Sequence, residues 1–408
     1  MADEVPVGRR VAYWRKRRSM SQQLFADRLG KSKSWLDKVE RGVRRLDKFS
    51  VLQEIADSLR IDVALLLPEG QAPQPVGPTT LIDLGDLDAV QAALERYEQV
   101  GLCPAPAPPP LADVRKSVRH AWLTFQHGRY PVLVRAVPKL LRDTQAVELA
   151  YRVPAERITE TAHLHGQAYL VASTVLRKLG HHRLAWIAAD RAMVIAGRAG
   201  DKLLTGLAAG HAGQALLGLD RPRSALEITT LAATALAPGG ATYPEHISVY
   251  GHLLLQAALA AATIGDSVSV YGLLGSAGEA AADLADDANH LWTAFGPTNL
   301  ALHQAAAAVQ LGDGERAIRI HQKIDPDLLT ALPAERRANH QLTLAHAYAQ
   351  IGAVDRAGDA LLLGDRLAKA EIRCRPMAHA VITDVLRGTR GTPPAPVAAL
   401  AEQMGVGI

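Results

Sequence analysis

Cysteine and aromatic residues are scarce in this 408-residue chain, and both shortages restrict its fold. It has 2 cysteines, Cys103 and Cys374, which lie far apart in sequence and in unlike surroundings. A disulfide framework is therefore not expected, and a reducing compartment fits. Only 4% of the residues are aromatic, whereas alanine and leucine are abundant. This composition favours helices, because aromatic and β-branched side chains favour strands.

Long apolar runs are also missing. No segment reaches the length of about 18 uninterrupted apolar residues that a membrane helix needs. The Ala-rich stretch 253–264 is too short and is interpreted as a buried helix. The first residues, MADEVPVGRRVAYWRKRR, lack the apolar run of a secretion signal. We therefore expect a cytoplasmic protein that does not associate with a membrane.

Catalytic and metal-binding motifs are not found either. The chain has no His-Glu-x-x-His motif, no glycine-rich phosphate loop of the right form and no nucleophile elbow. Its 15 histidines are scattered, and the stretches 163–165 and 181–182 lack Cys or carboxylate partners at metal-ligand spacing. We expect no cofactor, no metal and no enzymatic activity.

Charge is distributed unevenly along the chain. The net charge is +4, yet residues 5–50 hold 14 Lys and Arg against 4 Asp and Glu, so the remainder is mildly acidic. A basic segment on a near-neutral body indicates a polyanionic partner. The alternative is a solvated, charged surface without such a partner.

Residues 1–67 are expected to form a domain of five short helices. Ser21 and Ser32 each precede a helical stretch as an N-cap, since a serine hydroxyl accepts a hydrogen bond from an unpaired backbone N–H. Gly30 and Gly42 end those stretches, because glycine takes the left-handed conformation of a tight turn. The predicted helices cover residues 7–18, 21–29, 33–41, 49–59 and 63–67.

A helix, a short glycine turn and a second helix have the spacing of a helix-turn-helix. The stretch 21–42 fits the pattern Ser-Gln-Gln-x-x-Ala-x-x-x-Gly-x-Ser-x-x-x-Leu-x-x-x-Glu-x-Gly, with small, turn and apolar positions all in register. It closely resembles the Cro/phage-repressor-like (XRE) family, and the resemblance covers residues 7–67. The positions that carry it are Ser21, Gln22, Gln23, Ala26, Gly30, Ser32, Leu36, Glu40 and Gly42.

The resemblance implies that the helix over 33–41 enters the DNA major groove with its N-terminus first. The base-reading residues would be Lys33, Ser34 and Trp35, with Lys38 one turn later, since lysine donates to guanine and serine donates or accepts. Trp35 either touches a base methyl group or packs partly against the domain. The candidates for phosphate contact, which adds affinity without reading sequence, are Gln22, Arg15, Lys16, Arg17, Arg18, Arg41, Arg44 and Arg45.

Other residues of the motif are expected to build the domain. Ala26, Leu36 and Val39 are assigned to its core. Glu40 is expected to brace the fold through an arginine of the first helix and not to read a base.

Two Pro-rich stretches, 68–80 and 103–110, follow this domain and are interpreted as linkers. A helix is predicted between them over 86–99. It could serve in dimerisation or pack on either domain, and the sequence leaves this open. The expected organisation is a DNA-binding domain at 1–67, a linker region with one helix at 68–110 and a dimerisation and sensor domain at 111–408.

A weak repeat runs through residues 111–408. Its anchor is a helix that ends near glycine, a short polar turn and a second helix, as in Leu311-Gly312-Asp313-Gly314. Stacked helix pairs of this kind bury one continuous core. The region resembles tetratricopeptide-like (TPR-like) domains, so we expect an all-α chain with a right-handed helical superhelix behind the linker. The anchors lie at 127–130, 179–182, 217–220, 264–267, 311–314 and 351–354, and alanines follow most of them, at Ala185, Ala225, Ala317 and Ala357.

An XRE domain before TPR-like repeats resembles the peptide-sensing regulators collectively called RRNPP. The resemblance implies a short peptide on the concave face, clamped by asparagine amides that both donate and accept. Asn299 could instead cap its helix, and interior or surface roles are favoured for His252 and His303. A small-molecule effector, a protein partner or no ligand remain equally open. The candidate effector residues are Asn299, Asn339, Asn289, His252, His303, Trp292 and Arg337.

The leading hypothesis is a sequence-specific, DNA-binding transcription regulator. It would act as a homodimer, since one recognition helix reads too few bases for useful specificity. The alternative is an interaction adaptor whose repeats bind a partner protein, with DNA binding secondary. An enzyme would need an activity that survives removal of residues 1–67, and nothing in the sequence supports one.

Overall fold

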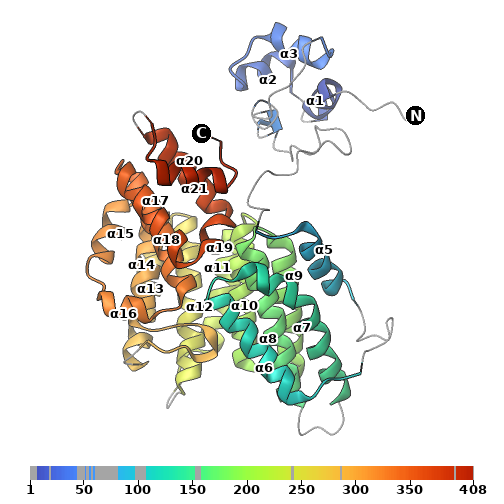
Figure 1. The fold of residues 1–408 in the computed structure, drawn as a ribbon, viewed down its shortest axis with the longest axis vertical. Coiled ribbons are helices and arrows are strands. Elements are labelled where there is room, and N and C mark those ends of the chain that lie inside the picture. Colours follow the sequence, from blue (N-terminus) through green and yellow to red (C-terminus); the bar gives the residue numbers. More distant parts are fainter. Residues whose placement is uncertain are drawn as a thin grey trace. The chain divides into compact units, whose positions relative to one another are not determined.

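The computed structural model describes residues 7–17, 20–43, 51, 55, 56, 58, 59, 81–96, 107–151, 158–239, 243–284, 287–389 and 392–407. Every regular element in these ranges is a helix, so the fold is all-α as the composition predicted (Figure 1). The chain divides into two compact units, Met1–Val76 and Gly77–Ile408. Among the described helices, none combines the length and apolarity needed to cross a bilayer.

The N-terminal unit contains α1 (Val7–Arg17), α2 (Gln22–Arg28) and α3 (Lys33–Glu40). The predicted caps are confirmed, because the Ser21 and Ser32 hydroxyls accept hydrogen bonds of 3.1 Å from the Leu24 and Trp35 N–H groups. Gly30 ends α2 with φ +62°, the left-handed conformation expected of it. The buried core of the unit comprises Val11, Phe25, Ala26, Leu29, Leu36, Val39, Ile55, Ala56 and Leu59.

The remainder of the five-helix prediction lies mostly outside the described residues. Of the helix expected over 49–59, residues 51, 55, 56, 58 and 59 are described, and they are helical. The helix expected over 63–67 falls entirely outside.

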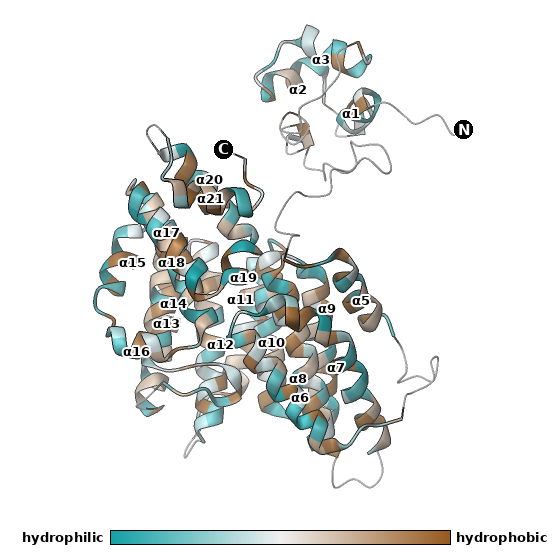
Figure 2. Ribbon diagram, viewed as in Figure 1, coloured by the Kyte–Doolittle hydropathy of each residue, from teal (hydrophilic) through white to brown (hydrophobic). Residues whose placement is uncertain are grey.

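The second unit is built from successive helices that pack on their neighbours. Figure 1 follows them from green α6 through yellow α12 to red α21, and Figure 2 shows polar and apolar stretches on the same helices, as expected where one face is buried. The helices are α5 (Leu84–Leu94), α6 (Leu111–Gln126), α7 (Tyr130–Ala150), α8 (Ile158–Lys178), α9 (His182–Ala199), α10 (Lys202–Gly218), α11 (Pro222–Ala235), α12 (Pro244–Thr263), α13 (Ser267–Leu284), the 3-10 helix η4 (His290–Trp292), α14 (Pro297–Gln310), α15 (Gly314–His321), α16 (Pro326–Ala331), α17 (Ala334–Gln350), α18 (Val354–Leu367), α19 (Lys369–Arg373), α20 (Pro376–Gly388) and α21 (Ala395–Gln403).

The turns of the repeat follow the predicted anchors. The anchor glycines at 128, 180, 265, 312 and 352 all have positive φ between +67° and +83°. The anchor at 217–220 differs, because Gly218 ends α10 and Asp220 takes the left-handed conformation instead, with φ 57°. Small residues allow close helix crossings, and the four predicted repeat alanines, Ala185, Ala225, Ala317 and Ala357, are all buried.

The helix between the two Pro-rich stretches belongs to the second unit. It begins after Asp83, whose carboxylate accepts a hydrogen bond of 3.0 Å from the Gly85 N–H, and it ends at Leu94, earlier than predicted. Val90 and Leu94 are buried in the core that also contains residues of α7. Of the two domains on which the sequence allowed this helix to pack, the structure shows packing on the repeats.

The beginning and the end of the second unit meet across a buried charge cluster. Lys178 of α8 lies 2.5 Å from Glu335 of α17 and 2.6 Å from Glu371 of α19. Tyr130 of α7 also donates to Glu371, and Arg375 lies 2.5 Å from the same carboxylate. Helix α17 packs on α6 as well. The last repeats are therefore held directly against the first.

Candidate DNA-binding helix and central pocket

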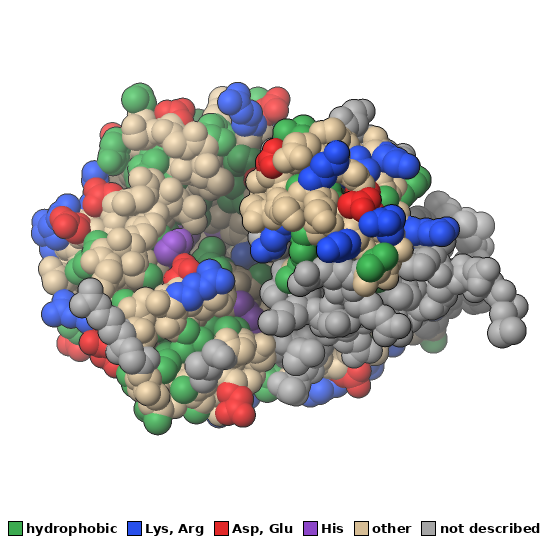
Figure 3. Space-filling model, turned by 90° about the horizontal axis from the view of Figure 1, so that it is seen from above, with side chains coloured by type: hydrophobic (Ala, Val, Ile, Leu, Met, Phe, Trp, Pro, Cys, Tyr) green, Lys and Arg blue, Asp and Glu red, His purple; other side chains and the backbone are tan. Residues whose placement is uncertain are grey.

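Helix α3 presents polar residues on one side and is anchored by apolar residues on the other. Leu36 and Val39 are fully buried, which fixes the helix to the unit. Lys33, Ser34 and Lys38 are exposed, as a base-reading role requires. Figure 3 shows several Lys and Arg side chains on the visible face of this unit.

Trp35 is half-buried at the edge of the same core. Its position matches the partial packing that was one of its two predicted roles. Part of the indole remains accessible beside Lys33 and Ser34.

Glu40 is the centre of a buried brace. The Arg15 guanidinium donates to both Glu40 carboxylate oxygens, at 2.6 and 3.0 Å, and its remaining nitrogen donates to the Met20 carbonyl at 2.6 Å. The Gln22 amide donates to Glu40 at 2.8 Å. These bonds agree with the expectation that Glu40 braces the fold through an arginine of the first helix.

The brace changes the assignment of Arg15. Because this arginine is 7% exposed and all three of its guanidinium nitrogens are engaged inside the unit, it is not placed to hold a phosphate. Gln22 keeps one amide hydrogen beyond the bond to Glu40. Arg41 is exposed and paired with Asp37 at 2.6 Å. The side chain of Arg17 and residues Arg18, Arg44 and Arg45 lie outside the described part of the chain.

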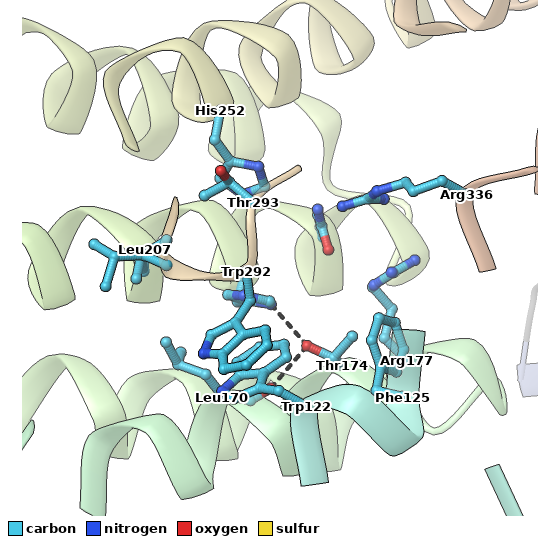
Figure 4. Close-up of a pocket in the computed structure, with 13 residues that line it drawn as sticks. Trp122, Phe125, Leu170, Thr174, Arg177, Leu207, His252, Trp292, Thr293 and Arg336 are labelled. Carbon is cyan, nitrogen blue, oxygen red and sulfur yellow. Dashed lines mark hydrogen bonds between the residues drawn. The ribbon is translucent and has the colours of Figure 1, made fainter. Parts of the chain in front are cut away.

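The second unit encloses a pocket, here called the central pocket, between α6, α8, α10, α12, the start of α17 and residues 291–293 (Figure 4). One wall is aromatic, because Trp122 and Trp292 are nearly parallel at 11° with ring centroids 6.1 Å apart. Phe125 meets Trp122 edge-on at 6.2 Å. The pocket is nearly filled by its own side chains, because only about 20 Å³ of it admits the centre of a water molecule.

The charged groups of the central pocket are all cationic. Arg177 and Arg336 line it, and none of its 13 described lining residues is acidic. Burial, reinforced by the positive charge of Arg375, lowers the pKa of Arg177 to about 10. Arg177 therefore remains charged at neutral pH.

Two buried histidines add neutral polar groups to the pocket. His211 and Thr174 are hydrogen-bonded at 3.1 Å. Burial, together with the charges of Arg177 and Arg336, lowers the pKa of His211 to about 3, and burial lowers that of His252 well below its ordinary value. Three buried atoms of the lining have no hydrogen-bond partner within the described structure: His252 Nε2, Gln214 Oε1 and Arg177 Nε.

Residues 289–296 cross one side of the pocket in a strained conformation. Leu291, Trp292 and Ala294 have positive φ values of 48°, 66° and 50°. Such conformations cost ~1–3 kcal/mol each for residues other than glycine. The segment is held at one end by Phe295, which is fully buried. At the other end, Asn289 exchanges two hydrogen bonds of 3.0 Å with Gln126.

The effector candidates chosen from the sequence are dispersed in the structure. Trp292 and His252 line the central pocket, whereas Asn289 is paired with Gln126 and Asn339 accepts a hydrogen bond from Arg375. Asn299 lies within the first turn of α14, where its Oδ1 is buried and unpartnered.

His303 Nδ1 lies 2.9 Å from the Asn299 carbonyl, and burial lowers the pKa of His303 to about 4. Arg337 is half-buried and does not line the central pocket.

Sequence reasoning did not identify Arg177, Arg336, His211, Gln214 or Trp122 as pocket residues. A basic residue near the end of α8 or in the first turn of α17 has an ordinary surface pattern. Only the packing of α17 on the first repeats brings the two arginines to one pocket.

Comparison with known proteins identifies the N-terminal unit. Residues 6–67 match the family described as helix-turn-helix domain. The chain thus carries an N-terminal helix-turn-helix domain, as its sequence predicted, and the described elements that follow it are all helices.

The comparison with curated proteins found no match to this chain. Among solved structures it is similar to PlcR of Bacillus thuringiensis in complex with the peptide PapR7 and DNA, with 10% identity, coverage of 85% of this chain and 98% of that chain, and a TM-score of 0.32. It is also similar to aspartyl phosphate phosphatase F from Bacillus subtilis, with 9% identity, coverage of 90% and 96%, and a TM-score of 0.42. Both likenesses are too distant to bear on function.

Proposed function

We propose that the protein is a sequence-specific DNA-binding transcription regulator that acts in the cytoplasm. The observation that carries this proposal is the arrangement of α3 in a helix-turn-helix domain. Leu36 and Val39 hold the helix while Lys33 and Lys38 stay in solvent. In domains of this class the second helix of the motif enters the major groove, where lysine donates to guanine O6 and N7.

The remaining polar groups of the unit would position it on the DNA backbone. Gln22 and Arg41 have donors that can reach phosphate oxygens, and such contacts make affinity strongly dependent on salt. The rigid Arg15–Glu40 pair sets the orientation of α3 relative to α1. We assign no catalytic role to the chain.

The second unit is proposed to dimerise and to hold an effector in the central pocket. Dimerisation supplies a second recognition helix and thereby the length of site that useful specificity needs. An effector can act only if it prefers one arrangement of the DNA-binding units over another. The buried, unpartnered polar atoms of the pocket support a bound ligand, because such atoms are costly when they stay unsatisfied.

Fluorescence anisotropy of the full chain on its own upstream DNA, against scrambled DNA and across a salt series, tests the DNA-binding proposal. Specific sites exceed non-specific DNA by about 10³ to 10⁷. Lys33→Ala and Lys38→Ala should each reduce the preference by about tenfold, whereas Lys116→Ala, an exposed lysine of α6, should not. Weak, unselective binding that neither variant changes would support the adaptor hypothesis instead.

A further inference from the structure

The buried charge cluster next to the central pocket has more cations than anions. Arg177, Lys178, Arg336 and Arg375 surround only two carboxylates, Glu335 and Glu371. Lys178 lies within 2.6 Å of both carboxylates, and Arg375 lies 2.5 Å from Glu371. Two positive charges are therefore left without a matching acid in this cluster.

The unmatched charge is clearest at Arg177, one of the two arginines that line the pocket. Arg336 is 3.7 Å from Glu335, a carboxylate already held by Lys178, and Arg177 Nε is buried without a hydrogen-bond partner. A buried cation without a paired anion is unfavourable, since it has given up its hydration. An anion from outside the chain would therefore stabilise this site by pairing with the unmatched charge.

The rest of the pocket suits a flat apolar body rather than a bare inorganic ion. Trp122 and Phe125 offer aromatic surface beside the arginines (Figure 4). Beyond them, His252 Nε2 and Gln214 Oε1 are unpartnered, and His252 is only 5% exposed. These two atoms can fix polar substituents of a ligand, because a few well-placed polar groups in an apolar cavity give orientation and specificity.

We propose that the central pocket binds a small organic carboxylate with a flat ring, its carboxylate between Arg177 and Arg336 and its ring against Trp122. Guanidinium groups recognise carboxylates through paired, charge-assisted hydrogen bonds. A free organic acid and the C-terminus of a peptide share this chemistry. We assign the free acid, because the open space of the pocket, about 20 Å³, is too small for the end of a peptide chain and favours the smaller ligand.

Entry of the acid requires the 289–296 segment to shift. The open space of about 20 Å³ accepts little more than one water molecule. Trp292 fills the place facing Trp122, and it belongs to the segment in which three residues hold left-handed backbone conformations. Movement of this segment relieves that strain and uncovers the Trp122 ring.

Calorimetric titration of the full chain with 2-naphthoate and with its neutral analogue 2-naphthamide tests the assignment. The acid should bind at least about tenfold more tightly than the amide, because a hydrogen bond to a charged partner is stronger than one to a neutral partner. Arg177→Gln and Arg336→Gln should each bring the acid to the affinity of the amide. Arg223→Gln, which changes an exposed arginine of α11, should leave both affinities unchanged.

Several outcomes would overturn the assignment. One is that 2-naphthoate and 2-naphthamide bind equally, and another is that 2-naphthoate does not bind. A third is that Arg177→Gln and Arg336→Gln both keep the full affinity for 2-naphthoate. Binding of a peptide that ends in phenylalanine, lost on C-terminal amidation, without binding of 2-naphthoate would replace the free acid by a peptide terminus. Circular dichroism checks the fold of each variant, and Arg336→Gln changes a side chain that is 17% exposed and so tolerates replacement.

The titration measures ligand binding in the absence of DNA. Only the regulatory role of the acid rests on the proposed function. A failure to bind 2-naphthoate leaves the anisotropy result on DNA intact. A failure to select DNA likewise leaves the ligand site standing, so the two proposals fail separately.

Discussion

Replacing Lys178 by methionine should destabilise the second unit strongly, because it removes the buried ammonium that bonds both Glu335 and Glu371. Lys178, Glu335 and Glu371 are each at most 2% exposed. Methionine keeps an unbranched stem of similar length, so the change removes the charge and retains most of the packing. Breaking a buried ion pair in this way costs ~3–5 kcal/mol. Since Arg375 still pairs with Glu371 at 2.5 Å, we expect the lower part of that range.

Urea unfolding of the full chain, followed by circular dichroism, measures the loss, because most described helices lie in the second unit. Lys139→Met is the matched control. Lys139 is 72% exposed and pairs with Asp143 one helical turn away, and exposed pairs of this kind contribute about 0–1 kcal/mol. A loss in Lys178→Met no larger than that of the control would refute the reasoning.

The pH dependence gives an independent check on the same cluster. Burial acts to raise the pKa of Glu335, but the charges of Lys178 and Arg336 outweigh it and hold that pKa at about 2. A folded-state pKa below the unfolded value stabilises the protein above the unfolded pKa, and this stabilisation is lost as the pH falls towards the folded pKa. The wild type should therefore lose stability between about pH 5 and pH 2. The Lys178→Met variant should lose less stability over that pH interval than the wild type. Stability curves of the two proteins that run parallel against pH would contradict the role given to Lys178.

Two further predictions concern the 289–296 segment. Gly251→Ala should destabilise the second unit by about 1–3 kcal/mol in urea unfolding, because a Cβ atom there would lie 2.0 Å from the ring of buried Phe295. Its control, Gly272→Ala in α13, meets nothing within 4 Å and should stabilise by ~0.5–1 kcal/mol; similar effects of the two changes would contradict the packing described. Trp292→Ala should tighten 2-naphthoate binding by about threefold to tenfold, since the ligand no longer displaces an indole from Trp122. Weaker binding in this variant would mean that Trp292 holds the ligand and does not cover its site.

The N-terminal unit was largely predictable because its signals are local. Ser21 and Ser32 cap helices through groups three residues away, and Gly30 needs only its own backbone freedom to end α2. The role of Glu40 followed from the helix-turn-helix motif. Arg15 shows the limit of that reasoning, since a basic residue in a basic segment resembles a phosphate contact until its buried partner is known.

The repeat domain was predictable for a related reason. A glycine at each turn and a buried alanine after it reflect contacts between neighbouring helices, and these recur along the sequence. Where the repeat is less regular, at 217–220, the prediction of the turn residue was less accurate, and Asp220 replaces glycine in the left-handed position.

The central pocket, in contrast, depends on contacts between residues that are far apart in the sequence. Lys178 is separated from Glu335 by 157 positions and from Glu371 by 193. No periodicity or spacing in the sequence predicts contacts between residues so far apart. Nothing in the sequence therefore distinguishes Arg177 and Arg336 from surface arginines. The pairing of Lys178 with Glu335 draws the start of α17 to the end of α8, and the residues next in sequence, Arg336 and Arg177, then meet at the pocket. The ion pair that closes the repeat domain is thus also what assembles its cationic site.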